Sequence, residues 1–274
     1  MQVWDGISDS RISFDWASAA GYRTSSQQSN TIAYMIENAN LTTALLNRLN
    51  SLGDVTLYSP IRVDSINLGT ETDVLDLRSW PVVTLSDGKK LAARLLVGAD
   101  GANSPVRTFA GIPSRGWDYN RHGVVATLHL LEPGWGGEEY KIAYQRFLPT
   151  GPAAMLPLPG KMASLVWSTT PERAARLKML NTEDFVAMVN AAFRLSAVDL
   201  EYLHTIERGQ KGEVEWRLKH TRFDERKLPM EVVNVQQGSV AAFPLKMRHA
   251  DTYTGERVAL LGYVELLNPR GFIR

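Results

Sequence analysis

The sequence contains no cysteine. Disulfide frameworks, thiolate zinc sites, iron–sulfur clusters and a catalytic thiol are therefore excluded. An excess of charge of one sign is also missing, because 30 Lys and Arg residues balance 29 Asp and Glu residues to a net charge of +1. Nucleic-acid-binding proteins carry a basic surface, so the sequence predicts no nucleic-acid partner.

Long apolar runs are absent as well. The uncharged stretch at residues 147–160 has only 14 residues and contains four prolines, whereas a transmembrane helix needs about 20 apolar residues. We therefore expect no membrane-spanning helix. The residues that follow Met1 have neither a charged leader with an apolar core nor an Arg-rich amphipathic pattern, so we expect no targeting segment there.

Several catalytic motifs are missing. The histidines form no i, i+4 pair and have no carboxylate at metal-ligand spacing, so we expect no metal site and predict surface or core positions for them. They are His122, His129, His204, His220 and His249. There is no Gly-x-Ser-x-Gly elbow, no Gly-x-Gly-x-x-Gly loop and no complete phosphate-binding loop, which leaves hydrolases and NTPases without their usual motifs.

What is present is typical of a globular protein, since 44% of the 274 residues are hydrophobic and 22% are charged. This length suits one large domain or two small ones.

After a hairpin or irregular start, the leucine spacing over residues 38–53 predicts an amphipathic helix. Short strands are predicted at residues 55–58, 61–68, 82–85 and 91–97, and Asp87-Gly88 predicts a hairpin turn before the last of them.

A second section begins near Ser114 and predicts a mainly antiparallel sheet, with strands at residues 122–130, 140–148, 153–158 and 163–168. Thr170-Pro171 supplies a helix N-cap and a first-turn proline, and a helix with an apolar face is predicted around residues 185–193. Residues 204–227 carry both signs of charge, which favours a solvated surface excursion over a docking patch. Further strands are predicted at residues 239–243 and 257–261, the latter buried and closed by Gly262.

The densest group of informative residues lies at 95–107. A short buried strand, Leu95 to Val97, is followed by two glycines that would let a ligand approach the backbone. Ser104 and Pro105 predict a helix whose N-terminal N–H groups would suit a phosphate. Asp100 at the strand's carboxyl end could accept hydrogen bonds from ribose or ribityl hydroxyls, and Arg107 could contact an anion. The alternative is a plain strand-turn-helix with a structural aspartate.

This segment resembles the Asp-Gly fingerprint of the flavin-dependent aromatic hydroxylases, because Gly98, Asp100, Gly101, Ser104 and Arg107 all match. The helix that begins at Asn38 resembles the family's polar-x-x-Leu-x-x-x-Leu pattern. Residues 151–159 and 164–168 are similar to the ubiquinone-biosynthesis branch, and its eukaryotic mitochondrial members in particular. The resemblance continues through residues 243–245, 249–253 and 257–262, so it covers about residues 1–262.

The resemblance implies a mixed α/β fold. It has a partial, doubly wound FAD-binding domain at residues 1–113, a mainly antiparallel substrate-binding sheet with flanking helices at 114–237, and a return to the FAD-binding domain at 238–274. The cofactor-binding residues that it implies are Asn38, Gly98, Asp100, Gly101, Ser104, Arg107 and Gly262. A substrate pocket is predicted at Pro152, Met155, Leu156 and Leu158, although a core strand is an equally good interpretation of residues 155–158. No catalytic residue is assigned.

The implied activity is FAD-dependent hydroxylation of the ring of a polyprenylated phenol in ubiquinone biosynthesis. The reductant would be ferredoxin or an NAD(P)H-linked system, and the partners would be other ubiquinone-biosynthesis proteins. The implied location is peripheral, on the matrix side of the mitochondrial inner membrane. Because the cofactor carries the difficult chemistry, the absence of a catalytic triad is expected.

Two features depart from the family pattern. The Gly-x-Gly-x-x-Gly strand and loop that hold the FAD pyrophosphate are missing, and Tyr263 replaces the aspartate expected after Gly262. We therefore expect a truncated or alternatively spliced form, for which FAD binding is in doubt. The alternatives are a catalytically inactive isoform that acts as an interaction partner, a hydrolase or sugar enzyme on an unrelated α+β fold, and an unfolded remnant with an exposed sheet edge.

Overall fold

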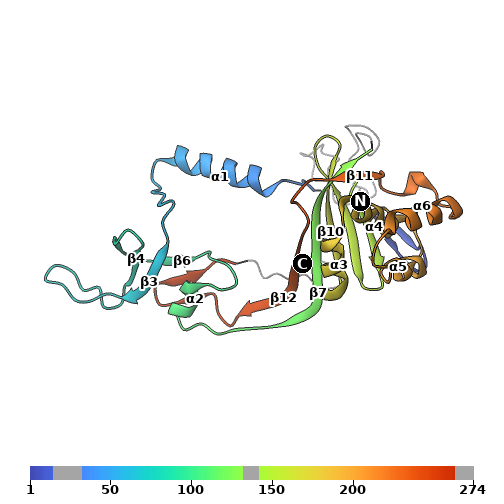
Figure 1. Ribbon diagram of the computed structural model, residues 1–274. Coiled ribbons are helices and arrows are strands. Elements are labelled where there is room, and N and C mark those ends of the chain that lie inside the picture. Colours follow the sequence, from blue (N-terminus) through green and yellow to red (C-terminus); the bar gives the residue numbers. More distant parts are fainter. Residues whose placement is uncertain (15–32, 132–141, 263–274) are drawn as a thin grey trace, which may run out of the picture. The chain divides into compact units, whose positions relative to one another are not determined.

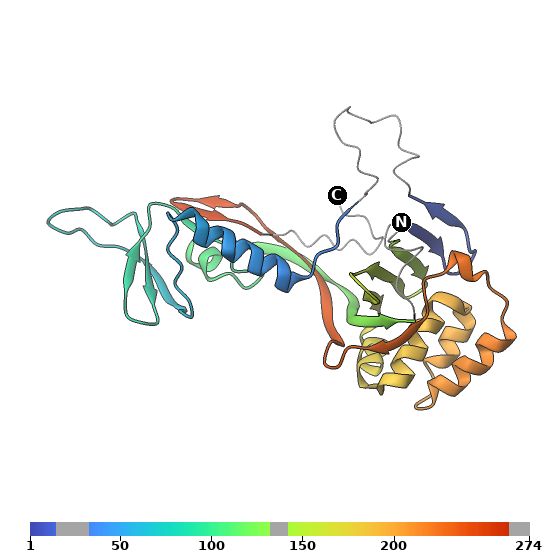
Figure 2. The ribbon, with the colours of Figure 1, turned by 90° about the horizontal axis from the view of Figure 1, so that it is seen from above.

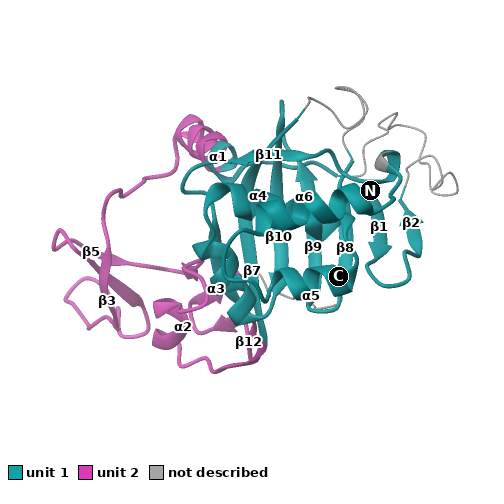
Figure 3. Ribbon diagram, turned by 45° about the vertical axis from the view of Figure 1, so that its right-hand side comes forward, with its two compact units in different colours: residues 1–41, 120–245 teal, residues 42–119, 246–274 magenta. Residues whose placement is uncertain are grey.

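The computed structural model describes residues 1–14, 33–131 and 142–262. The chain divides into two compact units (Figure 3): unit 1 comprises residues 1–41 and 120–245, and unit 2 comprises residues 42–119 and 246–274. The predicted domain limits differ from these, because the first residues join the sheet of unit 1. Tyr263, the residues after it, and the start of the strand predicted at 140–148 lie outside the described residues.

Unit 1 is built on one large sheet (Figure 1), in the order β11-β7-β10-β9-β8-β1-β2, and β12 also pairs with β7. The strands are β1 (Gln2–Asp5), β2 (Arg11–Ser13), β7 (Ser114–Leu130), β8 (Tyr144–Leu148), β9 (Gly151–Pro157), β10 (Met162–Thr169), β11 (Val232–Val235) and β12 (Ala241–Ala250). Adjacent strands are antiparallel from β11 to β8, and β1 is parallel to β8. The predicted antiparallel sheet is therefore confirmed.

Four helices cover one face of this sheet (Figures 1 and 2). They are α3 (Pro171–Met179), α4 (Thr182–Arg194), α5 (Ala197–Leu203) and α6 (Gln210–His220). The side chain of Thr170 caps α3, as predicted, and Asn181 and Ser196 cap α4 and α5 in the same way. Strand and helix residues form one core, in which Leu165, Trp167 and Phe185 are almost fully buried.

The charge-rich segment 204–227 is not only a surface excursion. It contains α6, whose Gln210 and Val214 are buried against the rest of unit 1, and it begins at the buried His204. The prediction of a solvated face holds for the outer side of α6 and for most residues on either side of the helix, such as Glu207, Arg208 and Arg222. Charge counting missed the buried side because two buried positions, with the partly buried Leu218, are enough to anchor a helix whose other residues are mostly polar.

Unit 2 contains two small sheets. One has the order β3-β4-β5, with β3 (Val63–Leu68), β4 (Pro81–Leu85) and β5 (Lys90–Ala92), and the predicted Asp87-Gly88 turn joins β4 to β5. The other has the order β13-β14-β6, with β6 (Leu96–Gly98), β13 (Thr254–Gly255) and β14 (Val258–Leu260). The single strand predicted over 91–97 is therefore wrong, because its two ends pair in different sheets. Residues 55–58 form no strand either.

The helix predicted after residue 38 is present as α1 (Asn38–Leu52). None of its residues is buried among the described parts of the chain, and the leucines of its apolar face, Leu41, Leu45 and Leu49, are 37% to 56% exposed. The spacing thus predicted the helix correctly but not the burial of its face. Among the described residues, no helix combines the length and the apolar character needed to cross a membrane.

Candidate functional site

The Asp-Gly segment forms a strand, a loop and a short helix within unit 2. The strand is β6 and the helix is α2 (Pro105–Phe109). A Cβ on Gly98 would lie 2.7 Å from the Cβ of Val106, so the absence of a side chain lets α2 pack directly on β6. Gly101 has a φ of +83° and nothing within 4 Å of the position of a Cβ. Its role is therefore conformational, and the space beside it is open.

The N-terminus of α2 is capped by two side chains. Ser104 Oγ accepts a hydrogen bond from Arg107 N at 3.0 Å, and Asp100 Oδ2 accepts one from Val106 N at 3.2 Å. Because Pro105 has no N–H, these two bonds use the free amides of Val106 and Arg107. The predicted N-cap is confirmed, and the N–H groups of Val106 and Arg107 are bonded to these side chains rather than free to meet a phosphate.

Other groups at this loop remain available. Asp100 is exposed, and only its Oδ2 oxygen is occupied by the helix. Arg107 Nε is buried and has no hydrogen-bond partner among the described residues. A buried donor without an acceptor is unusual in a folded protein. The loop thus offers one carboxylate oxygen and one guanidinium to a bound group.

The neighbouring strand brings Gly262 to the same end of the sheet. β14 is parallel to β6, with Leu260 opposite Gly98, and Leu261 N donates a hydrogen bond to Gly98 O at 2.8 Å. Gly262 follows directly, beside the Asp-Gly loop at the carboxyl ends of the two parallel strands. Ligands of open α/β sheets bind at this edge. The remaining predicted cofactor residue, Asn38, is the exposed first residue of α1 and belongs to unit 1.

The strands of this small sheet are less buried than predicted. Leu95 and Val97 are 58% and 44% exposed, and Leu261 is 65% exposed, although Gly98 and Val258 are buried. Among the described residues β6 pairs only with β14, so it is an edge strand. An apolar sequence predicts a buried strand only where a neighbouring strand and a covering layer are present.

The four predicted pocket residues lie on and after β9 in unit 1, but they do not share a face. Met155 is fully buried in the core beneath the helices, whereas Pro152 and Leu156 are half-buried on the opposite face of the sheet. Leu158 is buried just beyond the strand. For Met155 the core-strand interpretation is therefore correct, because side chains alternate between the two faces of a strand.

Sequence reasoning missed the neighbours of Leu156 across the sheet. In one row across β9, β10 and β7, Leu156 pairs with Ser164 and Ser164 pairs with Thr127. In the next row on the same face, Ala154 pairs with Val166 and Val166 pairs with Val125. We call the face that these side chains share the second face. It consists of Val125, Thr127, Pro152, Ala154, Leu156, Ser164 and Val166. The alternation of side chains along each strand could have grouped these residues on one face. The sequence does not show, however, which face of the sheet the helices cover.

Two solved structures have a similar fold. A probable FAD-dependent monooxygenase from Pseudomonas aeruginosa, pqsL, matches with a TM-score of 0.56 over 95% of this chain and 59% of that chain, at 18% identity. CmlS, a flavin-dependent halogenase, matches with a TM-score of 0.53 over 87% of this chain and 38% of that chain, at 15% identity. The chain therefore shares the fold of these two proteins.

The family model described as the FAD binding domain matches residues 12–223, and the chain belongs to this family. The mitochondrial ubiquinone biosynthesis monooxygenase COQ6 of Saccharomyces cerevisiae is 40% identical over 251 residues, which are 83% of this chain and 50% of that protein. The human protein of the same name is 38% identical over 263 residues, 96% of this chain and 53% of that protein. The resemblance drawn from residues 98–107 is confirmed, and the chain spans about half the length of these relatives.

Proposed function

We propose that this chain contributes part of the flavin site and the substrate-binding sheet of a monooxygenase that hydroxylates the ring of a polyprenylated phenol in ubiquinone biosynthesis. The observation that carries the proposal is the Asp-Gly loop, in which Asp100 caps α2 through Oδ2 and presents a second carboxylate oxygen that has no partner among the described residues. The named function of the COQ6 relatives supports the choice of substrate and pathway.

The residues of the loop fit a dinucleotide with a hydroxyl-rich chain. Arg107 Nε is a buried donor without an acceptor among the described residues, and the space beside Gly101 is open. In our proposal Asp100 accepts hydrogen bonds from ribityl or ribose hydroxyls, and Arg107 faces an anionic group. Gly101 and Gly262 allow the cofactor to approach the backbone, and Asn38 is a further candidate contact. When bound, FAD would supply the oxygen activation that no amino-acid side chain provides.

The second face of the large sheet is the proposed substrate surface. Its side chains are small or apolar and half-buried, with Leu156, Ala154 and Val166 as apolar contacts and the hydroxyl groups of Ser164 and Thr127 as the polar ones. An aromatic ring with an isoprenoid tail needs mostly apolar walls and a few polar groups that fix its orientation. We therefore reassign the proposed substrate pocket to Pro152, Leu156 and the neighbouring residues of the second face, and we leave Met155 out of it.

The finer parts of the proposal concern partners and location. We infer that the reductant is ferredoxin or an NAD(P)H-linked system and that the chain associates with other ubiquinone-biosynthesis proteins. The location would be peripheral, on the matrix side of the mitochondrial inner membrane. The mitochondrial names of the relatives support the compartment.

A flavin titration tests the proposal. FAD is added to the purified chain, and binding is followed by flavin absorbance and fluorescence quenching, with FMN for comparison. We expect saturable FAD binding that Asp100→Asn weakens by roughly tenfold, since about 1.4 kcal/mol of lost binding energy is a factor of ten. The matched control is Asp64→Asn, on β3 of the same unit, which should leave the affinity unchanged. Absence of saturable binding, or equal effects of the two variants, would refute the assignment.

A second measurement addresses the reaction. The chain is expressed in cells that lack the full-length relative, and ubiquinone is quantified by chromatography. Restored synthesis would support the monooxygenase. Flavin binding without restored synthesis would favour the alternative of an inactive isoform that acts as an interaction partner.

A further inference from the structure

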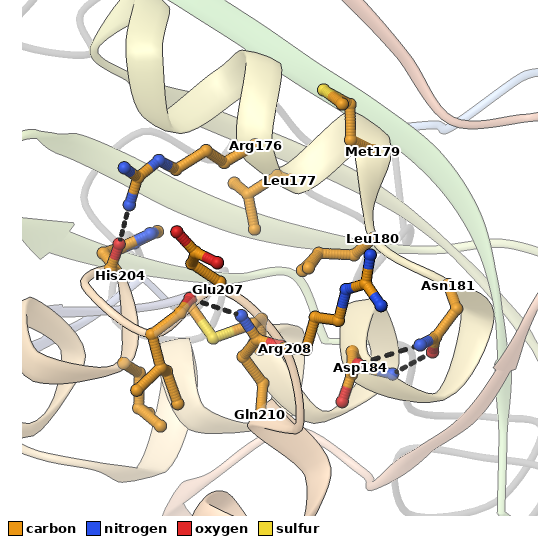
Figure 4. A pocket seen from close by; sticks show the side chains of 13 residues that line it. Arg176, Leu177, Met179, Leu180, Asn181, Asp184, His204, Glu207, Arg208 and Gln210 are labelled. Atoms are coloured by element: carbon orange, nitrogen blue, oxygen red, sulfur yellow. Dashed lines mark hydrogen bonds between the residues drawn. The ribbon is translucent and has the colours of Figure 1, made fainter.

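A cavity of about 580 Å³ lies within the helical layer of unit 1. It is formed where the C-termini of α3 and α5 meet the N-termini of α4 and α6 (Figure 4). We call it the helical cavity. Its volume lies in the range of about 300–1,000 Å³ that small-molecule sites occupy. Because the helices lie on the other side of the sheet from the second face, the helical cavity is separate from the proposed substrate surface.

The floor of the helical cavity is apolar. Leu177, Met188 and Leu203 line it and are themselves at most 1% exposed. Leu180 and Ile206 are half-buried at its sides. These five side chains come from α3, α4, α5, the turn between α3 and α4, and the loop between α5 and α6. Leu177, Met188 and Leu203 are covered, so the apolar surface that can contact an alkyl chain comes from Leu180 and Ile206.

One polar side chain is enclosed with this floor. His204 is only 8% exposed, packs against Trp167 with ring centroids 5.9 Å apart, and lines both the helical cavity and a smaller neighbouring one. Burial, with the nearby charges of Arg173 and Arg176, lowers the pKa of His204 to about 4. The imidazole is therefore neutral near pH 7 and contributes no charge to the helical cavity.

The charges at the mouth favour an anion. Arg208 has no ion-pair or hydrogen-bond partner among the described residues, and Arg176 uses one nitrogen to donate to His204 O. Asp184 is not available, because its oxygens accept from Lys211 N at 2.9 Å and Asn181 Nδ2 at 2.8 Å. Glu207 is the remaining carboxylate that lines the helical cavity. The helical cavity is thus lined by the guanidinium groups of Arg176 and Arg208 and, besides the occupied Asp184, by one carboxylate, that of Glu207.

We propose that the helical cavity binds an anionic amphiphile of the long-chain carboxylate class. The alkyl chain lies against Leu180 and Ile206, above the buried Leu177, Met188 and Leu203, and the carboxylate pairs with Arg208, with Arg176 as the second cation. Guanidinium groups bind carboxylates through two parallel hydrogen bonds, which orients the head group toward the mouth. The site is independent of the flavin, since all its residues belong to the helical layer of unit 1.

The test uses three probes that share one alkyl chain. Dodecanoate, dodecanol and dodecylamine are titrated into the purified chain below their micelle concentrations, and binding is measured by calorimetry. We expect dodecanoate to bind at one site per chain and at least tenfold more tightly than the alcohol and the amine. Equal binding of the three, tighter binding of the amine, or no binding of dodecanoate would overturn the proposal.

Three variants locate the site. Arg208→Ala should weaken dodecanoate binding about tenfold, and Glu207→Gln should strengthen it severalfold by removing the opposing carboxylate. Arg222→Ala removes another exposed arginine, one that does not line the helical cavity, and it should leave dodecanoate binding unchanged. All three residues are exposed, so folding should be retained, and circular dichroism checks this. Equal affinity in the Arg208 and Arg222 variants would refute the location.

Discussion

Asp100 Oδ2 accepts a hydrogen bond from Val106 N at 3.2 Å, and this contact joins the candidate cofactor loop to the helix that follows it. A carboxylate at a helix N-terminus satisfies a free N–H and interacts favourably with the helix dipole. Asp100 therefore contributes to stability whether or not a ligand is bound. Ser104 caps the same helix through its Oγ, which accepts from Arg107 N, so the contribution of the cap to stability can be measured at Ser104 without changing the carboxylate of Asp100.

Ser104→Ala should reduce the free energy of unfolding by about 1 kcal/mol, the usual cost of removing an N-cap oxygen. Ser104 is 5% exposed, and its Oγ accepts from Arg107 N. Urea denaturation followed by circular dichroism measures the change. The control is Ser114→Ala at the exposed start of β7, where little effect is expected. Indistinguishable midpoints for the two variants would show that the cap contributes nothing.

Arg146→Met should destabilise the protein by about 3 kcal/mol or more. The Arg146 side chain is buried in unit 1, where Nη1 donates to Ala192 O at 3.0 Å and Leu195 O at 2.8 Å, and Nη2 donates to Gly6 O at 3.3 Å. Methionine fills similar space but leaves three buried carbonyl groups without these donors, each worth about 1 kcal/mol or more. The unfolding free energy in urea is compared with that of Arg222→Met, an exposed control that should change it by at most about 0.5 kcal/mol.

Met155→Ala and Leu156→Ala should separate the two faces of β9. Met155 is fully buried in the core, so its truncation should cost about 3 kcal/mol of unfolding free energy. Leu156 is half-buried on the second face, and its truncation should cost about 1 kcal/mol while weakening substrate binding. Thermal unfolding and binding of a prenylated phenol analogue measure the two effects. A larger stability loss for Leu156→Ala would reverse the assignment of faces.

The features that the sequence predicted correctly are local. The caps at Ser104 and Thr170 and the Asp87-Gly88 turn depend on side chains within three residues of the backbone groups they bind, so the pattern is visible in a short window. The Asp-Gly loop was found for the same reason, since its residues lie within ten positions of one another.

The features that were missed depend on distant partners. Residues 91–97 look like one strand, but β5 pairs with β4 while β6 pairs with β14, more than 150 residues further along the chain. Arg146 is an ordinary arginine in the sequence, and its acceptors lie 46, 49 and 140 positions away. Which face of β9 becomes core is decided by the helices that follow it, so Met155 and Leu156 could not be told apart.

The stability of the protein should fall as the pH decreases from 6.5 toward 4 because of His204. Its pKa in the folded protein is about 4, below the 6.5 of the unfolded chain, so the unfolded state binds the additional proton over this range. A depressed histidine pKa therefore contributes stability that is present above pH 6.5 and is lost on acidification, by roughly 3 kcal/mol for a shift of this size. Urea unfolding at pH 7.5, 6 and 5 should show this slope in the wild type and in His220→Gln, whose histidine is exposed. His204→Gln should flatten it, because glutamine does not titrate; an unchanged slope in that variant would assign the acid sensitivity to other groups.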